Sequence, residues 1–313
     1  MLRNPRTNRH NEYLDVIICQ FLTLVWTVDH RFSLRCWPRT VYDAAMSEIL
    51  EMVLTREVRL AATSMVSAPG VANNFSANPA PDGLSPVLTL SIQITGQVQA
   101  DTGMLVNIKR IDHVVRAIAA PTVTIPKGGG IQPIRPEFVL ADLFNRCTAA
   151  LAPYTVSALT LNLSPWMYYQ TCGGEIPMIR MAQRFEFSAA HRLHNPSLSA
   201  EKNRELFGKC NNPNGHGHNY ELEVVIGGIP QAQSGQIMPL LEFQRLVNQH
   251  VISVFDHKHL NMDCPEFAAL NPTVENIAQV IFSKIREVFP PGVKLLAVKV
   301  WETPKTCCEV RAP

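Results

Sequence analysis

Three histidines stand at spacings that could hold one metal ion. His216 and His218 flank Gly217 directly after the sequence NNPNG, whose composition is typical of a turn, so a strand is predicted to begin at His216. Residues i and i+2 of a strand point to the same face. His191 ends the segment RFEFSAAH, where the hairpin partner of that strand would lie. Three neutral imidazoles suit Zn²⁺ and leave a fourth coordination position open, which favours catalysis over a structural role.

A cysteine and an Asp-His pair accompany this set. Cys210 precedes His216 by six residues, and two roles for it stay open: a fourth ligand that closes the site, or a thiolate base beside the metal. Asp256 and His257 place a carboxylate next to an imidazole. A Cys-His-Asp relay would hold a base in the right protonation state. The plainer interpretation makes Asp256 a turn residue and His257 a surface residue.

Further carboxylates lie at the ends of predicted elements. Thr273 is a good N-cap for a last helix, and Glu275 in its first turn suits the helix dipole. Glu302 ends an alternating apolar strand, where a carboxylate needs a partner; a buried carboxylate commonly accepts two parallel N–H bonds from an aminopyrimidine edge. His194 and His259 are interpreted as surface or supporting residues.

The chain contains two related halves. The matching segments each predict strands around a turn, then two amphipathic helices and a closing strand. They are 88–118 with 220–250 at an offset of 132, then 137–144 with 275–282 and 158–165 with 297–304 at offsets of 138 and 139. A glycine-rich insertion, PKGGG at 126–130, absorbs the change and is predicted to be a loop.

These patterns predict an α+β protein built of two tandem units, each an antiparallel four-stranded sheet with two helices on one face. We expect one unit over 46–172 and a second over 175–313. Residues 1–45 match neither half. They are interpreted as an over-extended start before Met46 or Met52, with an ordinary extension or a targeting segment as alternatives.

Only the second half carries the candidate chemistry. Residues 52–170 hold one histidine, His113, and residues 175–313 hold seven. At the repeat offset Glu275 alone has a counterpart of its own type, Glu137. At the offset of 132, the residues opposite His216, His218, Cys210, Asp256 and His257 are Leu84, Pro86, Asn78, Thr124 and Ile125. At the offset of 138, the residue opposite Glu302 is Ser164.

Composition excludes several classes. The 313 residues are 46% hydrophobic and 17% charged, which excludes global disorder, and a net charge of +2 leaves no electrostatic footprint for nucleic acid. The apolar run 16–28 is too short to cross a bilayer as a helix. The eight cysteines form no regular framework, which predicts a reducing, cytoplasmic location.

At these residues the sequence resembles the 6-pyruvoyltetrahydropterin synthase and 6-carboxytetrahydropterin synthase superfamily. The resemblance spans about 180–310 and rests on motifs in the usual order: FEFSAAHRLH, LFGKCNNPNGHGHNYELEV, FDHKHLN, PTVENIA and VKVWET. It implies the tunnelling fold, in which units join side by side into a barrel, and hence a homo-oligomer. The first half would be such a unit without a metal site.

The resemblance also implies roles. His191, His216 and His218 would bind Zn²⁺, Cys210 would be the base with Asp256 and His257 as partners, and Glu302, Thr273 and Glu275 would bind the pterin. The implied substrate is 7,8-dihydroneopterin triphosphate, with loss of triphosphate. The spacing C-x5-H-G-H is more typical of the pyruvoyl branch; the alternatives are a 6-carboxytetrahydropterin synthase of queuosine biosynthesis and a non-catalytic zinc-stabilised pterin-binding scaffold.

Overall fold

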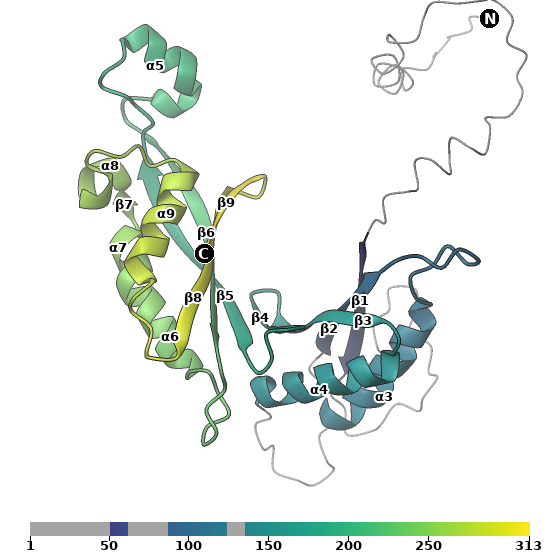
Figure 1. The fold of residues 1–313 in the computed structure, drawn as a ribbon. Coiled ribbons are helices and arrows are strands. Elements are labelled where there is room, and N and C mark those ends of the chain that lie inside the picture. Colours follow the sequence, from purple (N-terminus) through teal and green to yellow (C-terminus); the bar gives the residue numbers. More distant parts are fainter. Residues whose placement is uncertain (1–50, 62–86, 124–134) are drawn as a thin grey trace, which may run out of the picture. The chain divides into compact units, whose positions relative to one another are not determined.

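The computed structural model describes residues 51–61, 87–123 and 135–313, and the predictions for 1–45 and for the glycine-rich loop lie outside them. Pairs of strands alternate with pairs of helices (Figure 1). The first half contains β1 (Met52–Ala61), β2 (Val87–Gly96), α3 (Ile108–Val123), α4 (Pro136–Leu151), β3 (Thr155–Ser164) and β4 (Met167–Cys172).

The second half follows the same order, with additional short elements. It contains β5 (Ile179–His191), α5 (Ala200–Phe207), η1 (Gly208–Asn211), β6 (His216–Gly228), α6 (Leu240–Val247), η2 (Asn248–Ile252), α7 (Ser253–Phe255), β7 (Lys258–His259), α8 (Leu260–Asp263), η3 (Pro265–Phe267), α9 (Val274–Ile285), β8 (Val293–Thr303) and β9 (Thr306–Arg311).

The described strands form a single large sheet. Its order is β1-β2-β3-β4-β5-β6-β8-β9 with antiparallel neighbours, and the two-residue β7 pairs in parallel with β5. The predicted α+β class with antiparallel pairing is therefore confirmed. The sheet is larger than expected, because β4 pairs with β5 from Met167↔Gln183 to Gln170↔Arg180 and so joins the strands of both halves.

One sequence prediction is wrong. A second strand was expected after the first turn of each half, but residues 97–107 and 229–239 lead through a closed turn directly into α3 and α6. The turns use backbone groups that a ladder would need: Gln99 N donates to Met104 O, and Gly103 N donates to Gln99 O. The second strand pair of each half instead follows the helices.

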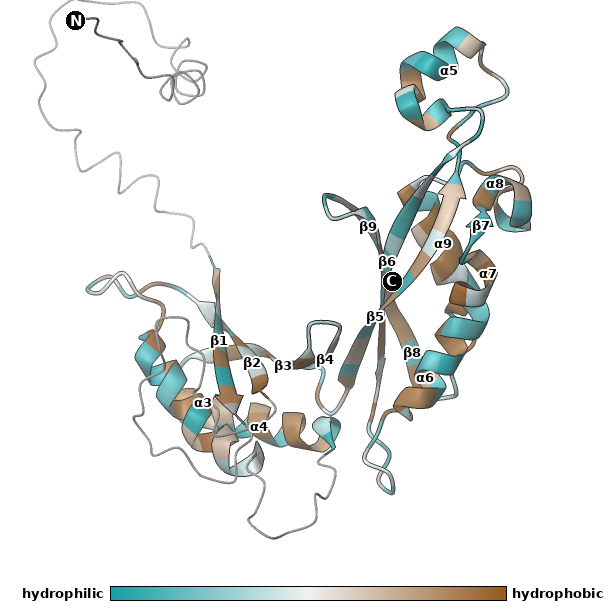
Figure 2. Cartoon of the chain, turned by 180° about the vertical axis from the view of Figure 1, so that it is seen from behind, coloured by the Kyte–Doolittle hydropathy of each residue, from teal (hydrophilic) through white to brown (hydrophobic). Residues whose placement is uncertain are grey.

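Alternation along the strands builds the core. In β6 Tyr220, Leu222, Val224 and Ile226 are buried and the residues between them are more exposed, as period-two packing on one face requires. Helix α9 buries its apolar stripe against β8 and β9, and α4 packs on β3 and β4. The ribbon of α6 changes between teal and brown along its length, as expected of a half-buried helix (Figure 2).

The segment between β5 and β6 extends beyond the end of these strands and carries α5 (Figure 1). The fully buried side chain of Asn203 forms hydrogen bonds with the backbone of this segment. Its Nδ2 donates to the carbonyl oxygens of Asn195, Leu198 and Ser199, and its Oδ1 accepts from Asn195 N at 2.7 Å. This segment ends in η1, which contains Cys210.

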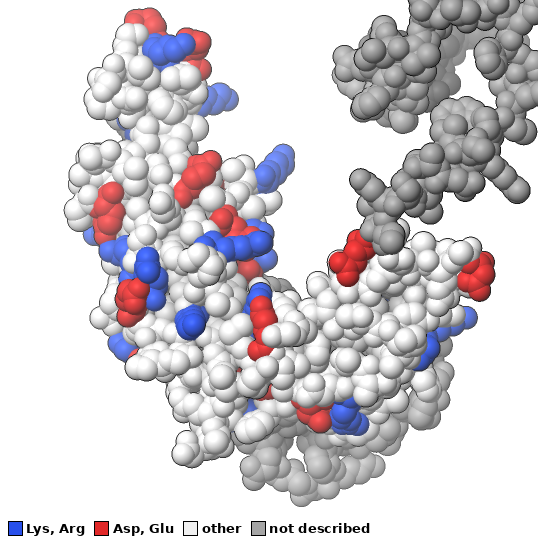
Figure 3. Space-filling model, viewed as in Figure 1, with Lys and Arg blue, Asp and Glu red and all other residues white. Residues whose placement is uncertain are grey.

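The surface shows no single-sign field on the face in view, where acidic and basic side chains of the described residues are interspersed (Figure 3). Among the described helices none is long and apolar enough to cross a membrane.

We predict that Asn203→Ala loosens the segment from 195 to 211 without unfolding the sheet. It removes the side-chain partner of the Leu198 carbonyl oxygen and of the Asn195 amide, whereas the carbonyl oxygens of Asn195 and Ser199 keep the backbone amides of Leu198 and Asn203. Each buried group left unsatisfied costs about 1–3 kcal/mol. Hydrogen exchange should accelerate there and stay slow in β6. The matched control is Asn212→Ala, whose exposed side chain only accepts from Asn214 N; equal loss of protection in both variants would contradict this account.

Candidate metal centre and active site

The structure brings the three predicted metal ligands together. His191 is the last residue of β5 and pairs directly with His216, the first residue of β6. Two residues further along the ladder, His218 pairs with Ala189. The ligand atoms of the three side chains lie within 4.8 Å of one another, and His191 Nε2 is 3.1 Å from His216 Nε2. The strand register alone therefore gathers the set.

Hydrogen bonding decides which nitrogen of His191 is free. Its Nδ1 lies 2.7 Å from the carbonyl oxygen of Pro272, which only accepts, so Nδ1 carries the proton and Nε2 keeps a lone pair. Burial lowers the pKa of His191 to about 4, although the Pro272 hydrogen bond opposes this and the neighbouring histidines add to it. His191 is therefore neutral at pH 7, as a metal ligand must be.

The other two imidazoles fit a metal as well. Burial lowers the pKa of His216, and His218 adds to the effect. Nδ1 of His216 and Nε2 of His218 are buried without a hydrogen-bond partner in the described chain. Three imidazoles that each offer a nitrogen within 4.8 Å of the others match the donor set that Zn²⁺ prefers, and the residues present fit such an ion.

Glu302 reaches the same centre from the neighbouring strand. Its Oε1 lies 3.4 Å from His191 Nε2 and 3.8 Å from His218 Nε2. The register explains this, since Trp301 pairs with Glu221 and Glu302 therefore extends β8 toward the start of β6. Glu302 is the second-last residue of β8, as the sequence predicts for a carboxylate at a strand end. The sequence did not predict that it approaches the histidines.

A glycine permits the tight start of β6. Gly215 has φ +73°, and a Cβ there would lie 2.7 Å from His259 Nε2 and 2.9 Å from the carbonyl oxygen of His191. Any side chain would force these groups apart. The turn before His216 is thus closed against the strand that carries His191.

Asp256 and His257 form a hydrogen-bonded pair at the edge of β5. Asp256 Oδ2 lies 2.8 Å from His257 Nδ1, and Asp256 Oδ1 accepts from Ser188 N. These two bonds, led by the one from Ser188, lower the pKa of Asp256. Asp256 thus holds the Nδ1 side of the His257 ring, and the His257 side chain is 83% exposed.

The backbone of His257 is strained. Its φ of +56° is the one positive value at a non-glycine position in the described chain, and its N–H donates to Ser188 O. Such conformations are held by surrounding contacts and cluster at functional sites.

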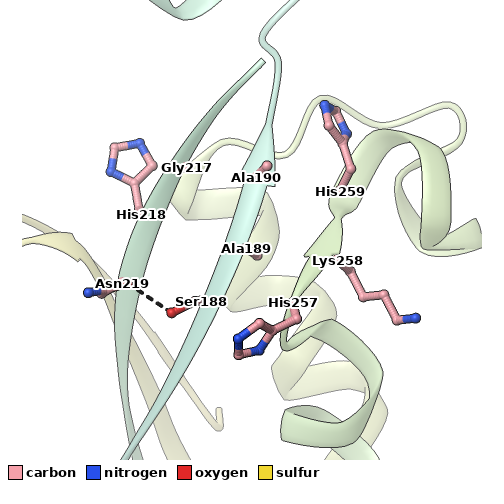
Figure 4. A pocket seen from close by; sticks show the side chains of 9 residues that line it. All are labelled: Ser188, Ala189, Ala190, Gly217, His218, Asn219, His257, Lys258 and His259. Carbon is pink, nitrogen blue, oxygen red and sulfur yellow. Dashed lines mark hydrogen bonds between the residues drawn. The ribbon is translucent and has the colours of Figure 1, made fainter. Parts of the chain in front are cut away.

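A cavity of about 530 Å³ links this pair with the metal centre. Figure 4 shows His257 beside Ser188, which donates to Asn219 Oδ1, with His218 on the next strand. The other lining residues are Ala189, Ala190, Gly217, Lys258 and His259. No carboxylate is among the described residues that line the cavity, but Asp256 is bonded to the lining residue His257, and Glu302 lies 3.8 Å from the lining residue His218.

Cys210 is the predicted site residue that the structure does not bring to its partners. Its carbonyl oxygen accepts from the backbone amide of Leu193, two residues after His191. Cys210 therefore lies on the metal side. No hydrogen bond in the described chain joins its thiol to Asp256 or His257.

Thr273 and Glu275 stand at the start of α9. The Thr273 hydroxyl accepts from Asn276 N, which confirms it as N-cap, and Glu275 is exposed in the first turn. Because Pro272 precedes them and holds His191, this helix start adjoins the metal centre.

Two supporting residues were missed by the sequence analysis. Tyr220 is fully buried, stacks on Phe187 and places its hydroxyl 3.5 Å from His191 Nδ1. Asn261 clasps the backbone next to His191, accepting from Arg192 N at 2.8 Å and donating to Arg192 O at 3.0 Å. The period-two pattern H-G-H-N-Y signalled Tyr220, but nothing local signalled the contact of Asn261.

The fold and centre define a histidine-triad α+β protein whose second half carries the site, and comparison with known proteins identifies the family. The family model for 6-pyruvoyl tetrahydropterin synthase matches residues 180–313. The human 6-pyruvoyl tetrahydrobiopterin synthase is 44% identical over 131 residues, 42% of this chain and 90% of the human protein. The chain belongs to the 6-pyruvoyl tetrahydropterin synthase family.

Two further relatives extend the comparison. A putative 6-carboxy-5,6,7,8-tetrahydropterin synthase of Archaeoglobus fulgidus is 34% identical over 125 residues, 40% of this chain and 89% of that protein. The solved 6-pyruvoyl tetrahydropterin synthase of Caenorhabditis elegans is 38% identical, covers 44% of this chain and 97% of its own, and aligns with a TM-score of 0.41.

We predict that the metal-free protein loses stability as pH falls from about 6.5 to about 4. The unfolded His191 takes up a proton near pH 6.5 and the folded one only near 4, so the unfolded state binds more protons in this window; the full shift corresponds to about 3 kcal/mol. Urea unfolding at several pH values measures it. His191→Asn should flatten the slope, and the exposed control His113→Asn should not.

We predict that His257→Gly is more stable than His257→Ala by about 1 kcal/mol, because glycine adopts the positive φ of this position without a Cβ penalty. Both variants lose the imidazole, so any difference in unfolding free energy reports backbone strain. Equal midpoints and slopes in denaturant would show that the strain is relieved when the side chain is removed.

Proposed function

We propose that this chain is a lyase that converts 7,8-dihydroneopterin triphosphate to 6-pyruvoyltetrahydropterin with release of triphosphate. The observation that carries the proposal is the convergent triad His191, His216 and His218, in which burial keeps His191 neutral. It lies in the segment that matches the family model, and a human relative named for this synthase is 44% identical there.

The triad would hold Zn²⁺. When bound, the ion would withdraw electron density from substrate hydroxyls and so acidify the adjacent C–H bonds. The Pro272 carbonyl fixes the His191 ring, and the buried Tyr220 hydroxyl lies against the same nitrogen. These contacts orient the lone pair toward the centre without a rearrangement.

The chain's own groups would bind the pterin and move protons. The Glu302 carboxylate can accept two parallel N–H bonds from the aminopyrimidine edge, and Thr273 and Glu275 offer further contacts at the adjoining helix start. Cys210 would take a proton from the substrate side chain as thiolate. His257 would exchange a proton through Nε2 while Asp256 holds Nδ1.

Assembly belongs to the same proposal. We infer two tandem tunnelling-fold units, 46–172 without a metal site and 175–313 with one, that associate as a homo-oligomer. The repeated element order and the pairing of β4 with β5 support this. Since no hydrogen bond joins Cys210 to His257 in the described chain, the proposal assigns their contact to the junctions of the oligomer.

A second product remains a candidate, since the Archaeoglobus relative is named for the carboxy reaction. That branch also releases acetaldehyde, so the products separate the two.

The test is an assay of the purified, zinc-loaded protein with 7,8-dihydroneopterin triphosphate. We predict triphosphate release without acetaldehyde, and about one zinc per chain by elemental analysis. Acetaldehyde would select the carboxy alternative, and a zinc-loaded protein that binds the substrate without turnover would support the scaffold alternative.

The variant Cys210→Ala separates a base from a ligand. A base predicts full zinc content and turnover lowered by at least about 10²-fold, since general acid-base groups typically contribute that much. Joint loss of zinc and stability would instead identify a fourth structural ligand. Cys307→Ala, an exposed thiol on β9, is the matched control and should behave as wild type.

A further inference from the structure

Glu302 stands at an irregularity of the strand that carries it. Trp301 on β8 pairs with Cys307 on β9, and the next pair joins Thr303 to Thr306, so the ladder passes over Glu302. The pairing of β8 with β6 reaches only as far as Trp301. One extra residue on one strand is a β-bulge, which disrupts the ladder locally and can re-aim a side chain. The ladder therefore sets the direction of the Glu302 side chain less firmly than that of its neighbours.

The carboxylate of Glu302 nevertheless has a defined place. Its Oε1 lies 3.4 Å from His191 Nε2 and 3.8 Å from His218 Nε2, and the side chain is 21% exposed. A long side chain loses rotamer freedom when it is fixed in this way, and a mobile backbone would add further alternatives. The contacts of the residue next to Glu302 therefore bear on where the carboxylate lies.

The residue before Glu302 is held on the opposite face of the sheet. Because successive strand residues point to opposite faces, Trp301 shares the face of Lys299, and the buried Val300 lies on the other. The guanidinium carbon of Arg184 lies 4.6 Å from the centroid of the Trp301 ring, and Lys299 Nζ lies 4.7 Å from it. Cations so close to an indole ring are attracted by its quadrupole. We call Arg184, Trp301 and Lys299 the tryptophan clamp.

Carboxylates of β6 anchor one cation of the tryptophan clamp. Arg184 on β5 places Nη1 3.3 Å from Glu221 Oε2 and Nε 3.4 Å from Glu223 Oε2. The Tyr168 hydroxyl donates to the other oxygen of Glu223 at 3.5 Å. A charge with several partners is held more firmly than a charge in an isolated surface pair. The Trp301 ring is thus fixed by a network that spans neighbouring strands.

We propose that the tryptophan clamp positions Glu302. The clamp fixes the Trp301 ring on one face of β8, and so fixes the backbone from which the Glu302 carboxylate reaches the histidines on the other face. The inference rests on the proposed function, in which Glu302 takes the aminopyrimidine edge of the substrate. The three clamp residues are positioning residues, and their effect on the reaction passes through Glu302.

A structural test measures where the carboxylate lies. Crystal structures of the metal-free wild type, Trp301→Phe and Trp301→Leu are compared by the distance from Glu302 Oε1 to His191 Nε2. We expect Trp301→Phe, which keeps an aromatic ring, to keep this distance within about 4 Å, and Trp301→Leu to let the carboxylate move beyond it. An unchanged distance in Trp301→Leu would contradict the proposal. This readout uses neither substrate nor turnover.

A kinetic test asks whether Trp301 acts through Glu302. Trp301→Leu should raise KM for 7,8-dihydroneopterin triphosphate about fivefold or more with kcat little changed, because it weakens a contact made in both the ground state and the transition state. Lys299→Met removes one cation and keeps the ring, so it should raise KM about two- to fivefold. Glu302→Gln should raise KM at least as much as Trp301→Leu. Adding Trp301→Leu to Glu302→Gln should then change KM less than about twofold.

The control Tyr154→Leu removes a similar contact in the first half, where the guanidinium carbon of Arg110 lies 5.3 Å from the ring centroid, and should leave KM and kcat unchanged. Circular dichroism reports whether each variant folds. An additive effect of Trp301→Leu in the Glu302→Gln background, or an unchanged KM in folded Lys299→Met, would overturn the proposal. A wild-type protein that does not turn over this substrate would instead overturn the proposed function, and the crystallographic distance would then decide the role of the clamp.

Discussion

The hydrogen bond from His191 Nδ1 to the Pro272 carbonyl oxygen connects the parts of the site that come from distant segments. It fixes the proton on Nδ1 of His191 and directs the lone pair of Nε2 toward His216. It also ties the end of β5 to the residue before α9, 81 positions later in the chain. Burial makes this neutral form the stable one, because a charged imidazole there would be desolvated.

The remaining contacts serve this arrangement. The register of β5 with β6 brings His191 opposite His216, and Gly215 lets the turn close against His191 without a clash. The Asn261 clasp holds the adjacent backbone. The two carboxylates have different partners. The carboxylate of Glu302 faces the histidines, whereas Asp256 is bonded to His257 and is kept ionised by the Ser188 amide.

The first half shares the backbone plan of the second and lacks its chemistry. Its element order and its turn at Gly103 match those of the second half down to individual hydrogen bonds, while its one histidine in the described ranges, His113, is exposed. Packing depends on apolar periodicity and turn geometry, and both are insensitive to the loss of metal ligands. A half that has no ligands can therefore keep its strands and its helices.

The sequence by itself determined the local features. The spacing H-x-H predicted two imidazoles on one face of a strand, the NNPNG turn predicted where that strand begins, and Thr273 predicted the start of α9; each follows from period and capping rules that act within a few residues. Only the tertiary structure decided that Glu302 approaches the triad, that Pro272 orients His191, and that no hydrogen bond joins the Cys210 thiol to His257 in the described chain. Those outcomes depend on strand register and on contacts between residues far apart in the sequence, such as His191 and Pro272, 81 positions apart, which no local pattern encodes.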